Sequence, residues 1–202
     1  MIVRFMLLCV LILPLNGCQT RVAVQVPDYQ LTKPPVPSDI KVTLLSKARD
    51  IRDKPRNQIG RHFFIVLPGP QVEPREGPLD RDIPKAVQQA LEVAGYTVTM
   101  VDRLHDAPGP VVVAQIDDLR NYSFAFYPLG IGRGRMQLSL HVVTSDGKEL
   151  WSGKTNPNGG MIISGFYMSG FITRIHQDLK DSLNQIVAMA STEEFKKHIR
   201  PQ

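Results

Sequence analysis

Residues 135–151 read RMQLSLHVVTSDGKELW, and this stretch decides the fold class. From position 136 to position 142 apolar and polar side chains alternate, which is the period of a strand with one buried face. Asp146-Gly147 follows and is a strong signal for a β-hairpin turn. With these two residues as the loop, Val142 faces Trp151, and the indole joins the apolar side. The stretch therefore predicts an antiparallel hairpin packed against a core.

Helical patterns lie on both sides of this hairpin in the sequence. Asp82 is a predicted N-cap, Pro84 fits into the first turn, and Gly95 ends the helix after Ala94. Residues 171–189 predict a second, longer helix. Its apolar positions recur at helical spacing, and they are Ile172, Ile175, Leu179, Leu183 and Ile186.

Further strands are predicted at 40–44, 62–67, 96–101 and 111–126. The run 62–67 is continuously apolar, which favours a buried central strand, and the Pro- and Gly-rich residues 69–78 predict an exposed loop. The order of elements predicts an α+β fold. We expect a two-layer sandwich in which a mostly antiparallel sheet carries two main helices packed on one face.

Composition limits the classes of function. The chain has 202 residues, 43% of them hydrophobic and 21% charged, which fits one globular domain with a core. Its formal net charge is +5, but the basic residues are scattered and form no run of five. This pattern argues against a nucleic-acid partner. A modest basic surplus fits attraction to anionic lipid, lipopolysaccharide or cell-wall polymer, or simply a basic soluble surface.

The first residues have the three regions of an export signal. Arg4 supplies the positive start, and Phe5–Leu13 is an apolar run of nine residues. That run is too short to span a bilayer, which takes about 20 residues. The following Leu15-Asn16-Gly17-Cys18 resembles the lipobox of bacterial lipoproteins, which implies cleavage before Cys18 and lipidation of this cysteine. The alternatives are an uncleaved signal anchor and a buried hydrophobic helix.

This leader sets the expected domain organisation. Residues 1–17 are a signal peptide, residues 18–38 are the lipidated Cys18 with a Pro-rich tether, and residues 39–202 are a single α+β domain. Cleavage removes Cys9, so one thiol remains, and an intramolecular disulfide or thiolate metal site is excluded. Gln19 after the cysteine implies, by resemblance to enterobacterial sorting, an outer-membrane anchor that faces the periplasm.

No motif in the sequence predicts a catalytic or metal site. The five histidines lack metal-ligand spacing, and Asp117-Asp118 on a strand would point to opposite faces unless a bulge intervenes. Residues 130–135 are Gly-rich but lead into a strand, so we predict a flexible hairpin connection and no phosphate loop. Ser164 and Ser169 lack the context of an esterase nucleophile. We therefore expect no enzyme, no cofactor and no metal; an envelope hydrolase is the remaining alternative.

The segment Gly159–Gly170, GGMIISGFYMSG, allows two interpretations. It is either a strand end and helix entry with close backbone packing, or a contact surface for a partner or lipid. The residues predicted for partner or lipid contact, from this segment and from the Gly-rich stretch before it, are Arg133, Arg135, Phe166, Tyr167 and Met168.

The order of these elements resembles a known family. The helix 82–94 followed by Gly95-Tyr96, the strand 111–123, the hairpin at Asp146-Gly147 and the helix 171–189 resemble the YajG-type outer-membrane lipoproteins. The architecture is also similar to the lipopolysaccharide-assembly lipoprotein that plugs an outer-membrane barrel, and to auxiliary lipoproteins of lipid-transporting ABC systems. The resemblance implies non-enzymatic work and transfers no site residue.

Two functions follow as expectations. The first is a membrane-anchored, periplasm-facing interaction or assembly module in envelope transport or biogenesis, with an envelope protein as partner. The second is direct binding or transfer of lipid or lipopolysaccharide through a basic and apolar patch that includes Arg133, Arg135 and Phe166.

Overall fold

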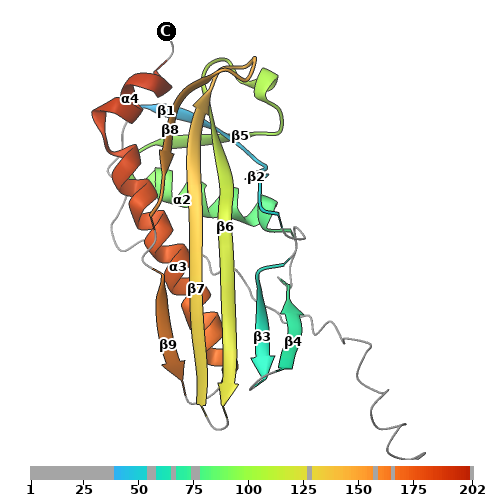
Figure 1. Ribbon diagram of the computed structural model, residues 1–202. Coiled ribbons are helices and arrows are strands. Elements are labelled where there is room, and N and C mark those ends of the chain that lie inside the picture. The colour runs from blue at the N-terminus through green and yellow to red at the C-terminus, as the bar shows by residue number, and fades with distance from the viewer. Residues whose placement is uncertain are drawn as a thin grey trace, which may run out of the picture.

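The computed structural model describes residues 39–53, 58–64, 67–73, 78–126, 129–156, 159–164 and 167–200 (Figure 1). These residues form one mixed sheet and three α-helices. The strands are β1 (Lys41–Leu45), β2 (Arg49–Asp50), β3 (Gly60–Phe64), β4 (Leu67–Val72), β5 (Thr97–Val101), β6 (Val111–Phe126), β7 (Leu129–Val143), β8 (Glu149–Lys154) and β9 (Gly160–Ser164). The helices are α2 (Leu79–Val93), α3 (Tyr167–Ala190) and α4 (Glu193–Ile199), with a 3-10 turn η1 (Leu104–Asp106).

The sheet is organised around the long antiparallel pair β6 and β7 (Figure 1). Strands β1, β2 and β3 follow one another along the free edge of β6, and all three run parallel to it. Strands β8 and β9 follow one another along the other edge of β7, antiparallel to it. Strand β5 extends the sheet beyond β1, and β4 extends it beyond β3. The predicted α+β class is confirmed, and the antiparallel ladders contain most of the paired residues.

The predicted hairpin is confirmed, but its loop differs from the expected one. Val142 pairs with Trp151 as predicted. The amide of Thr144 donates to the Lys148 carbonyl at 2.9 Å, and Gly147 has a φ of 87°. The loop therefore has three residues and ends in a left-handed glycine, a common three-residue hairpin. A register shift between Val142 and Val143 restores the expected pairing beyond the loop.

Helix α2 begins earlier than the sequence predicted. It starts at Leu79 instead of following Asp82, so Pro84 lies inside the helix. Proline has no amide to donate to the carbonyl four residues earlier, which belongs to Asp80. The amide of Ala48, just before β2, donates to that carbonyl at 2.7 Å and compensates the loss. A contact distant in sequence, invisible to local pattern, therefore permits the earlier start.

The end of α2 follows the prediction. Gly95 has a φ of 97°, the left-handed conformation that glycine adopts most easily. Its amide donates to the Glu92 carbonyl, and the amide of Tyr96 donates to the Leu91 carbonyl at 3.1 Å. This pair of hydrogen bonds is the Schellman motif, which turns the chain sharply from α2 into β5.

Tyr96 connects the end of α3 to the rest of the domain. Its hydroxyl donates to the Ala190 carbonyl at 2.5 Å, and burial raises the pKa of Tyr96 to about 12. Phe195 of α4 packs edge-on against Tyr96, with ring centroids 5.8 Å apart, and against Trp151 at 5.1 Å. Trp151, which was predicted to lie on the apolar face, is partly buried against the core and also contacts the last helix.

The main core lies between one face of the sheet and helices α2 and α3, as predicted. Its fully buried side chains come from inward positions of β6 and β7 and from both helices. The largest of them include Leu79, Ile83, Leu91, Ile116, Leu119, Met136, Leu138, Leu140, Phe171 and Leu179. On the opposite face, a smaller cluster of Val111, Val113 and Val143 packs against residues near η1. That cluster covers the end of the sheet where β6 begins.

The apolar run at 62–67 does not form the single central strand that was predicted. Strand β3 ends at Phe64 and β4 begins at Leu67, and the two pair as antiparallel neighbours. Strand β4 includes Pro68-Gly69-Pro70, which was expected in a loop. It is the last strand on its side of the sheet, where a proline removes no required ladder bond.

A bulge in β6 exchanges the two faces of the strand halfway along its length. The register with β7 shifts between Ile116 and Asp118. Before the bulge Ala114 and Ile116 are buried in the main core, whereas after it Leu119 and Asn121 are the buried positions. Since successive side chains alternate faces, one extra residue reverses the pattern. The lower half of β6 therefore presents its even-numbered residues to the side opposite α3.

The Gly-rich stretch 130–135 is strand and not the flexible connection that was predicted. It forms the first part of β7, with Gly130, Gly132 and Gly134 buried toward α3. A Cβ on Gly132 would lie 2.7 Å from the backbone oxygen of Gly170 in α3. The glycines therefore let the start of α3 approach the sheet backbone closely.

We predict that Gly132→Ala destabilises the domain by about 1–3 kcal/mol, as overpacking in a rigid site does. The added methyl meets backbone, which cannot rotate away. The measurement is the free energy of unfolding in a denaturant titration. The matched control is Gly109→Ala, because a Cβ at Gly109 has no atom within 4 Å. Equal stability of the two variants would show that α3 does not pack this closely.

Candidate interaction surface

The alternation of β7 separates its glycines from its arginines. Since Gly132 and Gly134 face α3, Arg133 and Arg135 point to the opposite face of the sheet, and both are exposed. This face is where the sequence analysis placed a partner or lipid contact. Figure 1 shows the surrounding elements: β3 and β4 lie beside β6, and β9 lies beside β7.

Four apolar side chains form a row across the outer face of this part of the sheet. Strand pairing aligns Phe63 of β3 with Phe124 of β6, Phe124 with Ile131 of β7, and Ile131 with Ile163 of β9. The rings of Phe63 and Phe124 stack with centroids 5.2 Å apart. Ile163 is 61% exposed. We call these four residues the apolar row.

The next row across the same strands mixes cations with apolar groups. It consists of Arg61, Tyr122, Arg133 and Met161, each paired in register with its neighbour. Met161 is 62% exposed, although methionine is normally buried. We call these four residues the mixed row, and the two rows together with the arginines beyond them the open face.

A pair of arginines lies beyond the mixed row. Arg120 of β6 and Arg135 of β7 are directly opposite each other in the ladder. Arg120 donates to Asp118 at 2.8 Å. Among the described residues, the side chains of Arg133 and Arg135 have no ion-pair or hydrogen-bond partner. Like charges in directly opposing positions destabilise a sheet. The opposed Arg120 and Arg135 therefore indicate a role other than stabilising the sheet.

The inner side of the same strands holds a buried polar cluster. Arg174 and Asp178, one turn apart on α3, form an ion pair with side chains 8% and 0% exposed. Asn121 is fully buried beside them, and a Cβ on Gly134 would collide with both Asn121 and Asp178. Burial raises the pKa of Asp178, and the hydrogen bond and charge of Arg174 oppose this shift. The cluster therefore depends on glycine in β7 for its space.

We predict that Asp178→Ala destabilises the domain by about 3–5 kcal/mol, because it leaves the buried Arg174 guanidinium without its carboxylate. Denaturant unfolding measures the change. Asp181→Ala, on the same helix but only half-buried, is the control and should have a small effect. The double variant Arg174→Met with Asp178→Leu should be more stable than Asp178→Ala. A double variant that is less stable would contradict a simple uncompensated-charge effect.

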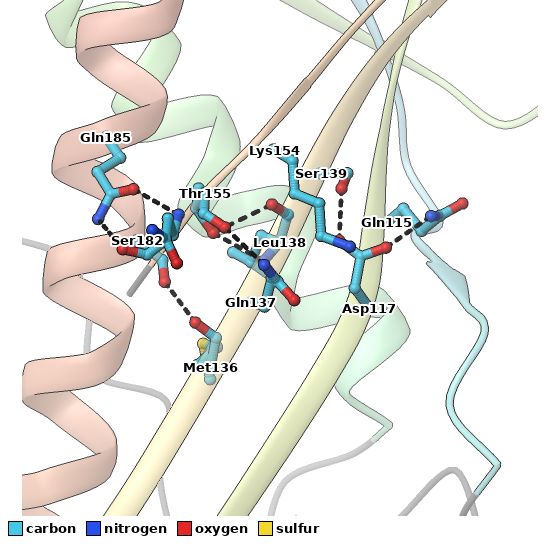
Figure 2. Close-up of polar contacts among 11 residues, drawn as sticks. Gln115, Asp117, Met136, Gln137, Leu138, Ser139, Lys154, Thr155, Ser182 and Gln185 are labelled. Atoms are coloured by element: carbon cyan, nitrogen blue, oxygen red, sulfur yellow. Dashed lines mark hydrogen bonds and ion pairs between the residues drawn. The ribbon is translucent and has the colours of Figure 1, made fainter. Parts of the chain in front are cut away.

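The sequence analysis noted that Asp117 and Asp118 could act together only if a bulge intervened, and β6 has a bulge at Asp117. Both carboxylates, however, already bind other side chains. Asp117 accepts from Gln115 at 2.8 Å and from Ser139 of β7, with Lys154 3.9 Å away (Figure 2). Asp118 is bound by Arg120. A pocket of about 150 Å³ beside them is lined in part by Arg52, whose side chain is paired with Asp50.

Figure 2 also shows the hydrogen bonds that join the middle of β7 to Thr155 and to helix α3. The hydroxyl of Thr155 accepts from the Leu138 amide at 2.9 Å, and Ser182 of α3 donates to the Met136 carbonyl at 3.0 Å. These bonds lie where β8 has ended and β9 has not begun, so they replace the missing ladder partners. The network is structural, and it fixes β7 relative to α3.

The histidines do not converge on a site. His141 was expected to be an isolated surface residue, but its Nδ1 lies 2.7 Å from Glu149 of β8, and this hydrogen bond lowers the pKa of Glu149. His105 lies 3.6 Å from Asp106. Among the described residues no three His, Cys, Asp or Glu side chains gather where a metal could bind.

Four of the six predicted site residues cannot be placed as side chains, and for two of these four the backbone also lies outside the description. Cys18 and Phe166 lie outside the described residues. Tyr167 and Met168 form the first residues of α3, but their side chains are outside the description, as are those of Ser164 and Ser169. The segment 159–170 contains both strand β9 and the start of α3. Its backbone therefore agrees with the first interpretation, a strand end followed by a helix entry. The exposure of Met161 and Ile163 is consistent with the second one.

The sequence analysis predicted Arg133 and Arg135 as contact residues but missed the residues that lie beside them on the open face. Phe63, Phe124 and Ile131 were assigned to strands or connections, with no hint that they share a row. The alternation of each strand was visible, but their neighbours are non-local in sequence. Arg61 and Arg120 were missed for the same reason.

Within the described part of the chain, no helix has both the length and the apolar composition to span a membrane. No family model matches this sequence, and no curated protein matches it either. The fold is similar to that of a neuraminyllactose-binding hemagglutinin homolog from Helicobacter pylori. That likeness has a TM-score of 0.53 at 10% identity, and it covers 88% of this chain and 96% of the other. At this identity it concerns the fold alone.

Two further solved structures are more distant. A PelC dodecamer from Paraburkholderia phytofirmans has a TM-score of 0.39 at 12% identity, covering 77% of this chain and 94% of that chain. A protein described as a lipoprotein from Caulobacter crescentus CB15 has a TM-score of 0.34 at 10% identity, covering 55% and 83%. Both TM-scores are too low to indicate a shared fold.

Proposed function

We propose that this chain is a lipid-anchored protein of the bacterial envelope whose domain is a non-enzymatic interaction module. Cys18 carries the anchor, at the outer membrane and facing the periplasm, and the open face contacts the partner. The observation that carries the proposal is the pair of rows across β3, β6, β7 and β9, which leaves Met161 and Ile163 more than half exposed. Contiguous exposed apolar groups of this kind mark interaction sites.

The position of the open face supports this role. The described chain begins next to β1, which pairs with the start of β6 at Val111. The mixed row crosses β6 at Tyr122, eleven residues further along the strand and so roughly 35 Å away. The first described residues and the open face therefore lie toward opposite ends of the β6–β7 pair. The YajG-type resemblance of the element order agrees with such non-enzymatic work.

A second function, direct binding of lipid or lipopolysaccharide, is favoured by one specific observation. Two carboxylates beside Arg120 are already engaged: Asp118 is paired with Arg120, and Asp117, which lines the same pocket, accepts from Gln115 and Ser139. Arg133 and Arg135 are thereby available to an anionic ligand. In this version of the proposal the partner is an envelope lipid.

We predict that Cys18→Ala moves the protein out of the salt-washed membrane fraction into the soluble or unprocessed pool, because the acyl chains can no longer be attached. Fractionation followed by immunoblotting measures this. Cys9→Ala is the control and should leave the distribution unchanged. A cleaved Cys18→Ala product that survives the high-salt wash would contradict lipid anchoring.

We predict that a photoreactive amino acid at Ile163 gives specific crosslinks in intact cells, since this side chain lies exposed in the apolar row. The same amino acid at Lys180, exposed on α3 and away from the open face, is the control and should give none. Recovery of the monomer alone from both positions would contradict the proposed interaction surface. Equal crosslinking from both would show that the contact is not specific to the open face.

A further inference from the structure

The outward side chains of β7 change character in a fixed order along the strand. Leu129 is 50% exposed, Ile131 belongs to the apolar row, and Arg133 and Arg135 follow. Outward positions are two residues apart, so successive rows are separated by about 7 Å. Along β7 the open face thus passes from apolar to cationic over a short distance; β3 and β6 follow the same order, whereas β9 is apolar at both levels.

The neighbouring strand β6 repeats this gradient, and β9 adds an apolar side chain at each of the first two levels. Phe124 and Ile163 lie level with Ile131, whereas Tyr122 and Met161 lie level with Arg133. Arg120 then lies level with Arg135. Apolar side chains at one end, an aromatic and arginine level next, and charges beyond are the order met along the normal of a bilayer from the acyl chains to the phosphates.

The gradient distinguishes a bilayer from a protein partner. A typical protein interface has an apolar centre with a polar rim around it. On the open face the apolar row lies toward the end where β6 ends and β7 begins, and the charges lie on its inner side. The charged side chains of the open face are all arginines, and Asp118, just beyond them, is paired with Arg120. An anionic surface complements this pattern, and guanidinium groups bind phosphate well.

We propose that the open face binds the surface of a bilayer containing anionic phospholipids, with the apolar row at the level of the acyl chains and Arg133 and Arg135 at the phosphates. This inference rests on the proposed function, since it takes the open face as the working surface and names its ligand. It adds a second membrane contact, independent of Cys18, at the end of the domain away from its first described residues.

The test uses the processed chain from residue 18 with Cys18→Ala, so that no acyl chain contributes. Its binding to phosphatidylcholine vesicles with and without phosphatidylglycerol is measured by cosedimentation over a range of salt. We expect binding to the anionic vesicles that falls as ionic strength rises. The double substitution Arg133→Gln with Arg135→Gln should weaken it about thirtyfold, from the usual contribution of each basic residue near an anionic surface.

Two comparisons make the result specific. Lys180→Gln with Lys197→Gln removes the same charge from exposed helix positions and should leave binding nearly unchanged. Met161→Ser with Ile163→Ser should weaken binding at every salt concentration, because it removes apolar contact and not charge. Thermal unfolding of each variant confirms that the domain is folded, as expected for exposed substitutions.

The outcomes separate this inference from the proposed function. Equal binding to neutral and anionic vesicles, or an equal loss in the two charge variants, overturns the lipid assignment. Crosslinks from Ile163 to a protein, together with no vesicle binding, also overturn it but leave the interaction module standing. Inorganic phosphate that displaces the protein from vesicles better than chloride at equal ionic strength would point to a free phosphate ligand and overturn a bilayer surface.

Discussion

The pairing of β6 with β7 is the constraint on which the rest of this domain depends. The two strands run together from Val111 paired with Val143 to Phe126 paired with Leu129, and every other described strand except β4 and β5 bonds directly to one of them. Because the strands are longer than any neighbour, several short strands share each edge in series. This length separates the end covered by η1 from the end that carries the open face.

The bulge and the glycines determine what each face of this pair can present. A period of two forces every residue of β7 to face either α3 or the opposite side. Glycine at 132 and 134 brings α3 close to the sheet, and the intervening Arg133 then necessarily points outward. In β6 the bulge at Asp117 puts Tyr122 and Phe124 on the same outward side. The buried Arg174–Asp178 pair and the exposed arginines are thus two consequences of one backbone arrangement.

Local patterns in the sequence predicted where helices and strands occur better than they predicted which elements pack against one another. The Val142–Trp151 pairing, the glycine end of α2 and the long α3 followed from periodicity and turn chemistry. The start of α2 did not, because the carbonyl freed by Pro84 is satisfied by Ala48, more than thirty residues earlier in the chain. The strand at Gly130 was mistaken for a connection because isolated glycines weaken a strand pattern, whereas here they fit the approach of α3. The open face was only partly foreseen, since β3 and β9 meet β6 and β7 through non-local pairing.

The separation between the start of the described domain and the open face has a physical consequence for any anchored form of the protein. A lipid anchor restrains the position of the first residue of the domain but leaves the orientation of the far end free when a Pro-rich segment intervenes. Roughly 35 Å of strand lies between these two ends. Under the proposed anchoring, the tether would set the effective concentration at which the open face meets its ligand, so that even weak contacts by Arg133 and Met161 would become occupied. High intrinsic affinity is not required of such a surface, which is consistent with a face on which Met161 and Ile163 are more than half exposed.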